Sequence, residues 1–111
     1  MTYLYNRNII ILITIRGENM TVKNYEKKAE LLKALGHPAR LCMVRRLIET
    51  DGCNVSYMQS CMKLPQSTVS QHIARLRAAG IIEGDRSGLE ITYRVIDEDA
   101  RAIIKILFSE D

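Results

Sequence analysis

The chain has 111 residues, enough for one domain with a hydrophobic core. Apolar residues make up 47% and charged residues 26%, as in ordinary globular proteins, and a formal net charge of +3 permits a polyanionic partner without requiring one. The apolar run at residues 8–15 is far shorter than the ~20 residues that span a bilayer, so no membrane association is expected.

Residues 1–19 are interpreted as an arm outside a domain of residues 20–111. The polar stretch 16–19 replaces the small residues of a signal-peptide cleavage site, which excludes export. The same Arg-Gly-Glu-Asn stretch can be encoded by a purine run resembling a ribosome-binding site directly before Met20. We therefore expect residues 1–19 to be translated leader sequence, the alternative being an authentic β-prone arm.

The domain begins with two predicted helices. Apolar residues at helical spacing predict the first helix, with Asn24 as its N-cap and Gly36 as its C-terminal stop. Pro38 suits the first turn of the second helix, which Asp51 and Gly52 end.

A helix-turn-helix pair follows. A short third helix over residues 55–62 precedes a fourth helix that ends at Gly80. In the fourth helix Val69, Ile73 and Leu76 recur at i, i+4 and i+7 and predict the buried stripe.

The outward face of the fourth helix is short and polar. It carries Ser67, Gln71, Ala74 and Ala78, with Thr68 and Arg75 beside them. Serine and threonine are only middling helix formers, and an ordinary solvated face more often carries Glu and Lys. This composition is typical of a face that lies against another surface.

The period changes after Gly80. Alternating residues predict two strands, about 81–85 and 90–96, around the turn 86–88. Asp97 caps a final helix over residues 98–108. The predicted fold class is mainly α with a small β-hairpin wing (α+β), because helix, helix, helix-turn-helix, hairpin, helix is the winged helix-turn-helix plan, whose recognition helix enters the major groove.

The final helix has more apolar residues than one buried face requires. A symmetric twofold contact is the commonest use of such a surplus. The alternative is a helix packed deeper in its own domain.

Three motifs in this order resemble the ArsR/SmtB family of winged-helix repressors: LLKALGHPARL, LPQSTVSQHIARLRAAGII and GLEITYRV. The resemblance covers about residues 29–107. It implies a cytoplasmic homodimer that represses by binding a pseudo-palindromic operator in double-stranded DNA. It also implies a dimer interface from the first and last helices, for which the candidates are Tyr25, Leu32, Ile103, Ile104 and Leu107.

The candidate DNA-binding residues divide by role. Gln71, with Ser67 and Thr68, is expected at base edges, since Gln pairs bidentately with adenine. The candidates for backbone contacts are Lys63, Gln66, Ser70, His72 and Arg75, with Arg86 on the wing as a minor-groove or phosphate reader. The alternatives are a packed or capping role for His72, a capping role for Ser67 and simple solvation of Arg75.

Neither metal site common in the family is expected. The thiolate pair would fall at Asn54 and Ser56, and the final helix has no histidine for a zinc site. His37 and His72 are expected to lie far apart. No metal and no cofactor is predicted.

The three cysteines, Cys42, Cys53 and Cys61, form an odd set that favours free thiols in a reducing cytoplasm. Cys53 and Cys61 lie eight residues apart and are too distant for a disulfide within one subunit. They are interpreted as small, partly buried thiols, with redox or soft-metal sensing as the alternative.

Nothing in the sequence indicates an enzyme, since it lacks a nucleophile elbow and a glycine-rich phosphate loop. A winged helix that binds only other proteins is the remaining alternative.

Overall fold

The computed structural model describes residues 22–110. The chain divides into two units, Met1–Glu30 and Leu31–Asp111, which we treat separately. The expectation that residues 1–19 are leader sequence concerns residues outside the described part.

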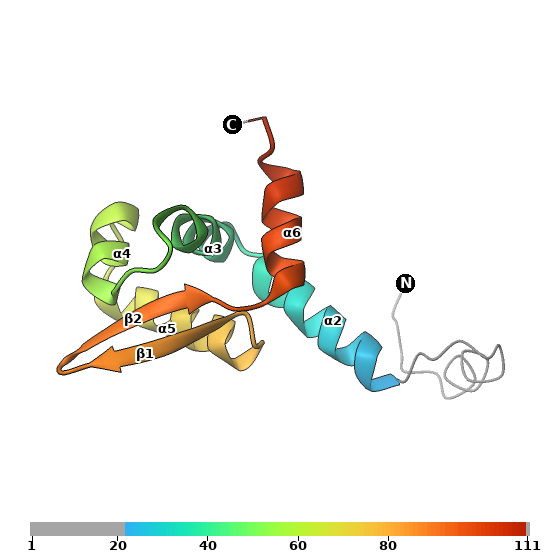
Figure 1. The fold of residues 1–111 in the computed structure, drawn as a ribbon, viewed down its shortest axis with the longest axis horizontal. Coiled ribbons are helices and arrows are strands. Elements are labelled where there is room, and N and C mark those ends of the chain that lie inside the picture. The colour runs from blue at the N-terminus through green and yellow to red at the C-terminus, as the bar shows by residue number, and fades with distance from the viewer. Residues whose placement is uncertain (1–21, 111) are drawn as a thin grey trace, which may run out of the picture. The chain divides into compact units, whose positions relative to one another are not determined.

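The described residues contain helices and one antiparallel hairpin, in the order that the sequence predicts (Figure 1). The elements are α2 (Val22–Leu35), α3 (Pro38–Thr50), α4 (Val55–Met62), α5 (Gln66–Ala78), β1 (Ile82–Ser87), β2 (Glu90–Val95) and α6 (Glu98–Leu107). The predicted class, mainly α with a small hairpin wing, is confirmed. Within residues 22–110, no helix has both the length and the apolar composition needed to cross a bilayer.

The ends of α3 follow from local chemistry. The His37 side chain caps the helix by accepting a hydrogen bond from the Ala39 N–H at 3.1 Å, and Pro38 occupies the first turn. Asp51 ends the helix in the left-handed region at φ 56°. Gly52 follows at φ 111°, where a Cβ would come within 2.8 Å of Arg94 Cγ. Both the backbone angle and the space therefore require glycine at this position.

Two element boundaries differ from the prediction. Helix α2 begins at Val22, so Asn24 lies inside its first turn and does not cap it. The hairpin pairs Ser87 with Glu90, which places the turn at Gly88 and Leu89 and leaves Arg86 within β1. The predicted turn over residues 86–88 was therefore wrong, because strand pairing extends further toward the tip than the alternation pattern indicates.

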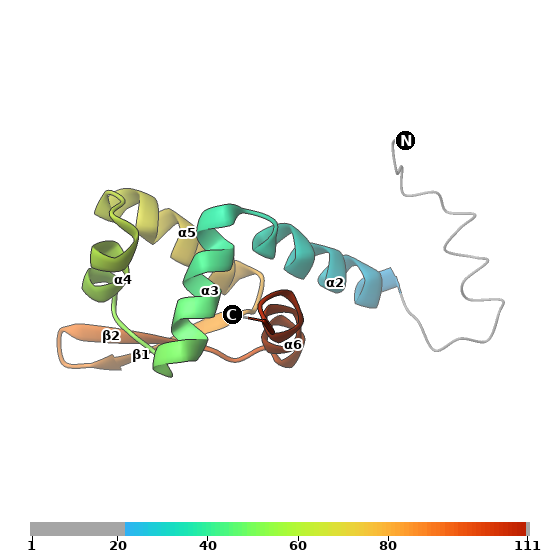
Figure 2. The ribbon, with the colours of Figure 1, turned by 90° about the horizontal axis from the view of Figure 1, so that it is seen from above.

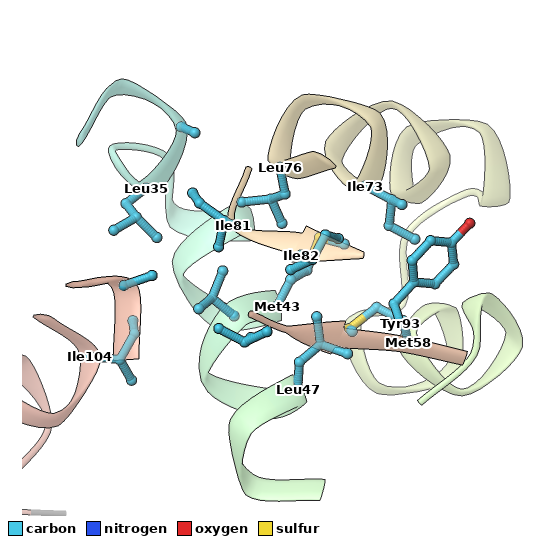
Figure 3. Packing of buried hydrophobic residues seen from close by; sticks show 14 of the residues in the cluster. Leu35, Met43, Leu47, Met58, Ile73, Leu76, Ile81, Ile82, Tyr93 and Ile104 are labelled. Carbon is cyan, nitrogen blue, oxygen red and sulfur yellow. The ribbon is translucent and has the colours of Figure 1, made fainter. Parts of the chain in front are cut away.

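The core of unit Leu31–Asp111 lies where α3, α5, the hairpin and α6 meet (Figure 3). Its largest fully buried side chains include Met43, Leu47, Met58, Leu76 and Ile81. Such apolar burial is the main favourable term in folding.

The two ends of the hairpin differ in their packing. Ile82, Tyr93 and Val95, at the base, are buried in the core. Gly84 sits opposite Tyr93, and a Cβ there would approach the Tyr93 ring to 3.0 Å. The outer half of β1 is exposed, and the tip points away from α6 (Figures 1 and 2). The hairpin is thus buried at its base and exposed at its tip.

Candidate nucleic-acid interface

Helix α5 packs on the core through one stripe of apolar side chains. Val69, Ile73 and Leu76 are the buried residues of this helix, as predicted. Helix α4 lies beside α5 in both views, as the first helix of the pair (Figures 1 and 2). The stripe fixes which face of α5 turns outward.

The outward face of α5 is exposed, uncharged and polar along its first two turns. Gln66, Ser67, Ser70, Gln71 and Ala74 are exposed, while Thr68 and Arg75 are half-buried. The helix has no acidic residue, and its last turn carries Arg75 and Arg77. This face therefore offers hydroxyl and amide groups with cations at one end.

The N-terminus of α5 has no side-chain cap. Pro65 occupies the capping position, and the first helical hydrogen bond runs from Val69 N–H to the Pro65 carbonyl at 3.1 Å. The N–H groups of Gln66, Ser67 and Thr68 therefore have no acceptor within the helix. Ser67 does not cap the helix, contrary to the alternative considered for it.

His72 lies in a cluster that joins α5 to the start of α3. Its ring centroid is 4.7 Å from that of His37, and its Nδ1 is 3.3 Å from Arg40 Nη1. The expectation that the two histidines lie far apart was wrong, because the packing of α3 against α5 brings the start of α3 to the middle of α5. Burial, followed by the charges of His37 and Arg40, lowers the pKa of His72.

Arg40 connects this cluster to α2. Its Nε donates to the Ala34 carbonyl and its Nη2 donates to the Lys33 carbonyl at 3.4 Å. Since Nδ1 of His72 faces Arg40, Nε2 is the ring nitrogen available to an outside partner. A packed His72 agrees with these contacts, and a DNA contact through Nε2 stays a prediction. No pattern in the sequence indicates this role of Arg40.

The two acidic residues nearest the tip of the wing have partners within the protein. Asp85 pairs with Arg94 at 3.6 Å, and the Asn54 side chain donates to the Glu90 carboxylate. Arg86 is exposed on β1, as a residue meeting DNA must be. Leu89, at the tip, was not singled out from the sequence and is fully exposed.

The three cysteines are free and occupy different environments. Cys42 on α3 and Cys61 on α4 are exposed, whereas Cys53 is half-buried. Cys53 precedes α4 and exchanges two backbone hydrogen bonds with Tyr93, which tie this segment to β2. Burial is the largest cause of the raised pKa of the Cys53 thiol.

Cys53 also lines an open pocket of about 380 Å³, together with Thr50, Gly52, Asn54, Tyr57 and Thr92. A hydrogen bond to Cys61 is the largest cause of the raised pKa of Tyr57. Within residues 22–110, no group of three or more His, Cys, Asp or Glu side chains is placed to hold a metal ion.

The dimer candidates divide by exposure. Leu32 is 58% and Leu107 57% exposed, and Tyr25 is also exposed. Ile103 is half-buried, and Ile104 is only 4% exposed because it packs in the hydrophobic core of the chain (Figure 3). Ile106, 74% exposed, carries the apolar surface that was expected of Ile104.

Comparisons with known proteins agree with this geometry. A sequence model described as a helix-turn-helix domain matches residues 35–85. The chain is 43% identical to the transcriptional repressor PagR of Bacillus anthracis over 74% of this chain and 82% of that protein. The crystal structure of PagR superposes with a TM-score of 0.72, covering 77% of this chain and 97% of that one at 41% identity.

Two further relatives are also named as transcriptional repressors. The chain is 41% identical to the repressor SmtB of Mycobacterium tuberculosis, over 68% of this chain and 55% of that protein. The crystal structure of the repressor BigR from Xylella fastidiosa has a TM-score of 0.69 at 34% identity, covering 81% of this chain and 95% of that one. With the fold, the exposed recognition face and these relatives together, the chain belongs to the ArsR/SmtB family of winged helix-turn-helix transcriptional regulators.

Proposed function

We propose that this protein is a homodimeric transcriptional repressor that binds a pseudo-palindromic operator with α5 in the major groove and the hairpin beside it. The relatives named as repressors, PagR and BigR among them, support the regulatory role. In this proposal the protein acts on DNA in the cytoplasm and catalyses no reaction.

The observation that carries the proposal is the outward face of α5. A helix held by three buried residues presents hydroxyl and amide side chains to the outside, and it has no acidic residue to repel phosphate. Gln71 is exposed, and its side chain matches the bidentate pairing of Gln with adenine. Ser67 and Thr68 suit bases or phosphates equally.

The N-terminus of α5 supports a phosphate contact. The N–H groups of Gln66 and Ser67 have no helical acceptor, and the positive end of the helix dipole points the same way. Lys63 precedes this end and is exposed, as are Ser70 and Arg86, the other candidates for backbone contacts. These contacts set the register in which Gln71 reaches a base.

The exposed apolar side chains of α6 support the dimer. Ile106 and Leu107 are 74% and 57% exposed, which is unusual for a helix that already buries Ala100 and Ile104. A twofold contact through these side chains would remove them from water. A dimer then presents two recognition helices to half-sites spaced by a whole number of helical turns, each about 34 Å.

The test is DNA binding by fluorescence anisotropy, using the promoter duplex directly upstream of the protein's own coding sequence and a scrambled duplex as competitor. Arg75→Ala and Arg86→Ala should weaken binding, and each lost phosphate contact should flatten the slope of log K against log salt by about 0.9. Lys105→Ala is the matched control, because it removes one exposed positive charge from α6, away from the hairpin tip.

The control should bind as tightly as the unmodified protein and with the same salt slope. Equal binding by all three variants would contradict the proposal and favour a winged helix that recognises only proteins.

A further inference from the structure

The tip of the hairpin carries a large apolar side chain that the fold does not require. Ser87 and Glu90 are the last paired residues, so Gly88 and Leu89 form a two-residue turn. Gly88 has φ 64° and Leu89 a negative φ, the combination of a turn with glycine at its first central position. Polar residues are usual at the second position, since the turn tip meets water.

The Leu89 side chain is not buried by any other part of its own chain. Its exposed fraction is 102%, the highest of the exposed large apolar side chains in the described chain. Single exposed leucines are common on protein surfaces. What distinguishes this one is its position at the exposed tip of the hairpin, together with the charges around it.

The acidic groups and the cation nearest the tip differ in their partners. Asp85 is held by Arg94 and Glu90 by Asn54, so both acidic groups nearest the tip are engaged within the protein. Arg86 lies three residues before Leu89 and, within the described residues, has no hydrogen-bond or ion-pair partner. The tip thus presents one free cation and one apolar side chain.

A free arginine beside an exposed apolar side chain is the combination by which proteins enter the minor groove. The cation follows the negative potential of the groove, and the apolar group packs between or against base steps. A protein partner could also cover Leu89, but DNA would in addition use the unpaired cation of Arg86, and the proposed function already places DNA beside the hairpin.

We propose that Leu89 enters the DNA minor groove beside the recognition-helix contact and acts as an apolar wedge, with Arg86 on the adjoining phosphates. The inference rests on the proposed function and adds to it a residue that contributes affinity without charge. It also implies a preference for easily unstacked pyrimidine–purine steps under the wing, because a wedge is inserted there at the lowest deformation cost.

The experiment measures binding to the same promoter duplex at several salt concentrations, with and without the minor-groove ligand netropsin. Leu89→Ala removes the wedge, Leu89→Met keeps an apolar side chain of similar size, and Arg86→Ala removes the charge. Thermal unfolding accompanies each variant and should be unchanged, since Leu89 is fully exposed.

Leu89→Ala should weaken binding by about fivefold to twentyfold, as expected for one leucine removed from water, with an unchanged salt slope. Leu89→Met should stay within about threefold of the unmodified protein. Arg86→Ala should flatten the slope by about one unit. Netropsin should reduce the effect of Leu89→Ala to less than about twofold, because the ligand occupies the groove that the leucine would enter.

Binding by Leu89→Ala within about twofold of the unmodified protein, or an effect that netropsin leaves intact, would overturn the wedge while leaving the repressor proposal standing. Loss of the repressor proposal itself is separately visible, because the unmodified protein would then fail to prefer the promoter over the scrambled duplex.

Discussion

Helices α5 and α6 have opposite outward faces, although both are short helices packed on the same core. Helix α5 buries Val69, Ile73 and Leu76 and turns polar side chains outward. Helix α6 buries Ala100 and Ile104 and turns Ile106 outward. The inward faces serve the same purpose, so the outward faces are what distinguish the proposed DNA-reading helix from the proposed dimer-forming helix.

The N-termini of α5 and α6 also differ, because only that of α6 is capped by a side chain. Asp97 caps α6 by accepting a hydrogen bond from the Ala100 N–H at 2.8 Å, and Glu98 and Asp99 lie in the first turn. Helix α5 has neither a capping side chain nor an acid in its first turn. The N-terminus of α6 therefore has a hydrogen-bond acceptor and negative charges within the protein, whereas the N-terminus of α5 can accept an external anion.

The largest expected effect comes from a charge placed on the apolar face of α6. Ile106→Glu should convert the dimer to a monomer at micromolar concentration, because the carboxylate would be buried against the partner copy. Losing the second half-site contact should weaken DNA binding by about a hundredfold or more. Sedimentation and anisotropy measure the two effects.

Ile96→Glu is the matched control, because it places the same carboxylate at an exposed isoleucine outside α6. A dimeric Ile106→Glu protein would show that α6 does not form the interface.

The next effect separates the two faces of α5. Ile73→Ala should lower the free energy of unfolding by about 2–5 kcal/mol, since it leaves a cavity in the core. Gln71→Ala should change it by less than about 0.5 kcal/mol, because the side chain is exposed. Urea unfolding measures both, and comparable losses would mean that Gln71 is part of the fold.

A smaller effect tests the open N-terminus of α5. Ser67→Glu should stabilise the protein by about 0.3–1 kcal/mol through the helix dipole and at the same time weaken DNA binding. Glu98→Gln removes a carboxylate from the first turn of α6, so it should lower the free energy of unfolding and leave DNA binding unchanged. A stabilised Ser67→Glu protein that binds DNA normally would exclude a phosphate at this end of α5.

The smallest effect concerns His72. Since its pKa is lowered in the folded protein, the unfolded chain binds a proton more readily, and stability should fall as pH drops through about 6.5. His72→Gln should reduce the difference in urea midpoint between pH 7.5 and 5.5. His37 also faces the cluster, so an equal difference in both proteins would assign the titration to other groups.

Local chemistry made most of the fold predictable. The stripe on α5, the stop at Asp51 and Gly52, and the cap at Asp97 all follow from residues close in sequence, and the structure confirms each of them. The exposed face of α5 follows from its buried stripe, which is why its candidate residues could be named in advance.

The features that were missed depend on contacts between distant elements. The approach of His37 to His72 requires the packing of α3 on α5, which no local pattern gives. The burial of Ile104 rather than Ile106 depends on which side of α6 meets the core. Leu89 was missed because a shift of the turn by a few residues changes which side chain stands at the tip.

The most direct test of the claim that α5 reads DNA is selection of bound sequences from a randomised duplex pool, run in parallel with the unmodified protein and Gln71→Ala. We expect the unmodified protein to enrich an inverted repeat whose half-site centres lie about 10–10.5 base pairs, or a multiple, apart. Gln71→Ala should enrich the same repeat with one symmetric position relaxed in each half-site. Identical motifs from both proteins, or no motif from either, would contradict that claim.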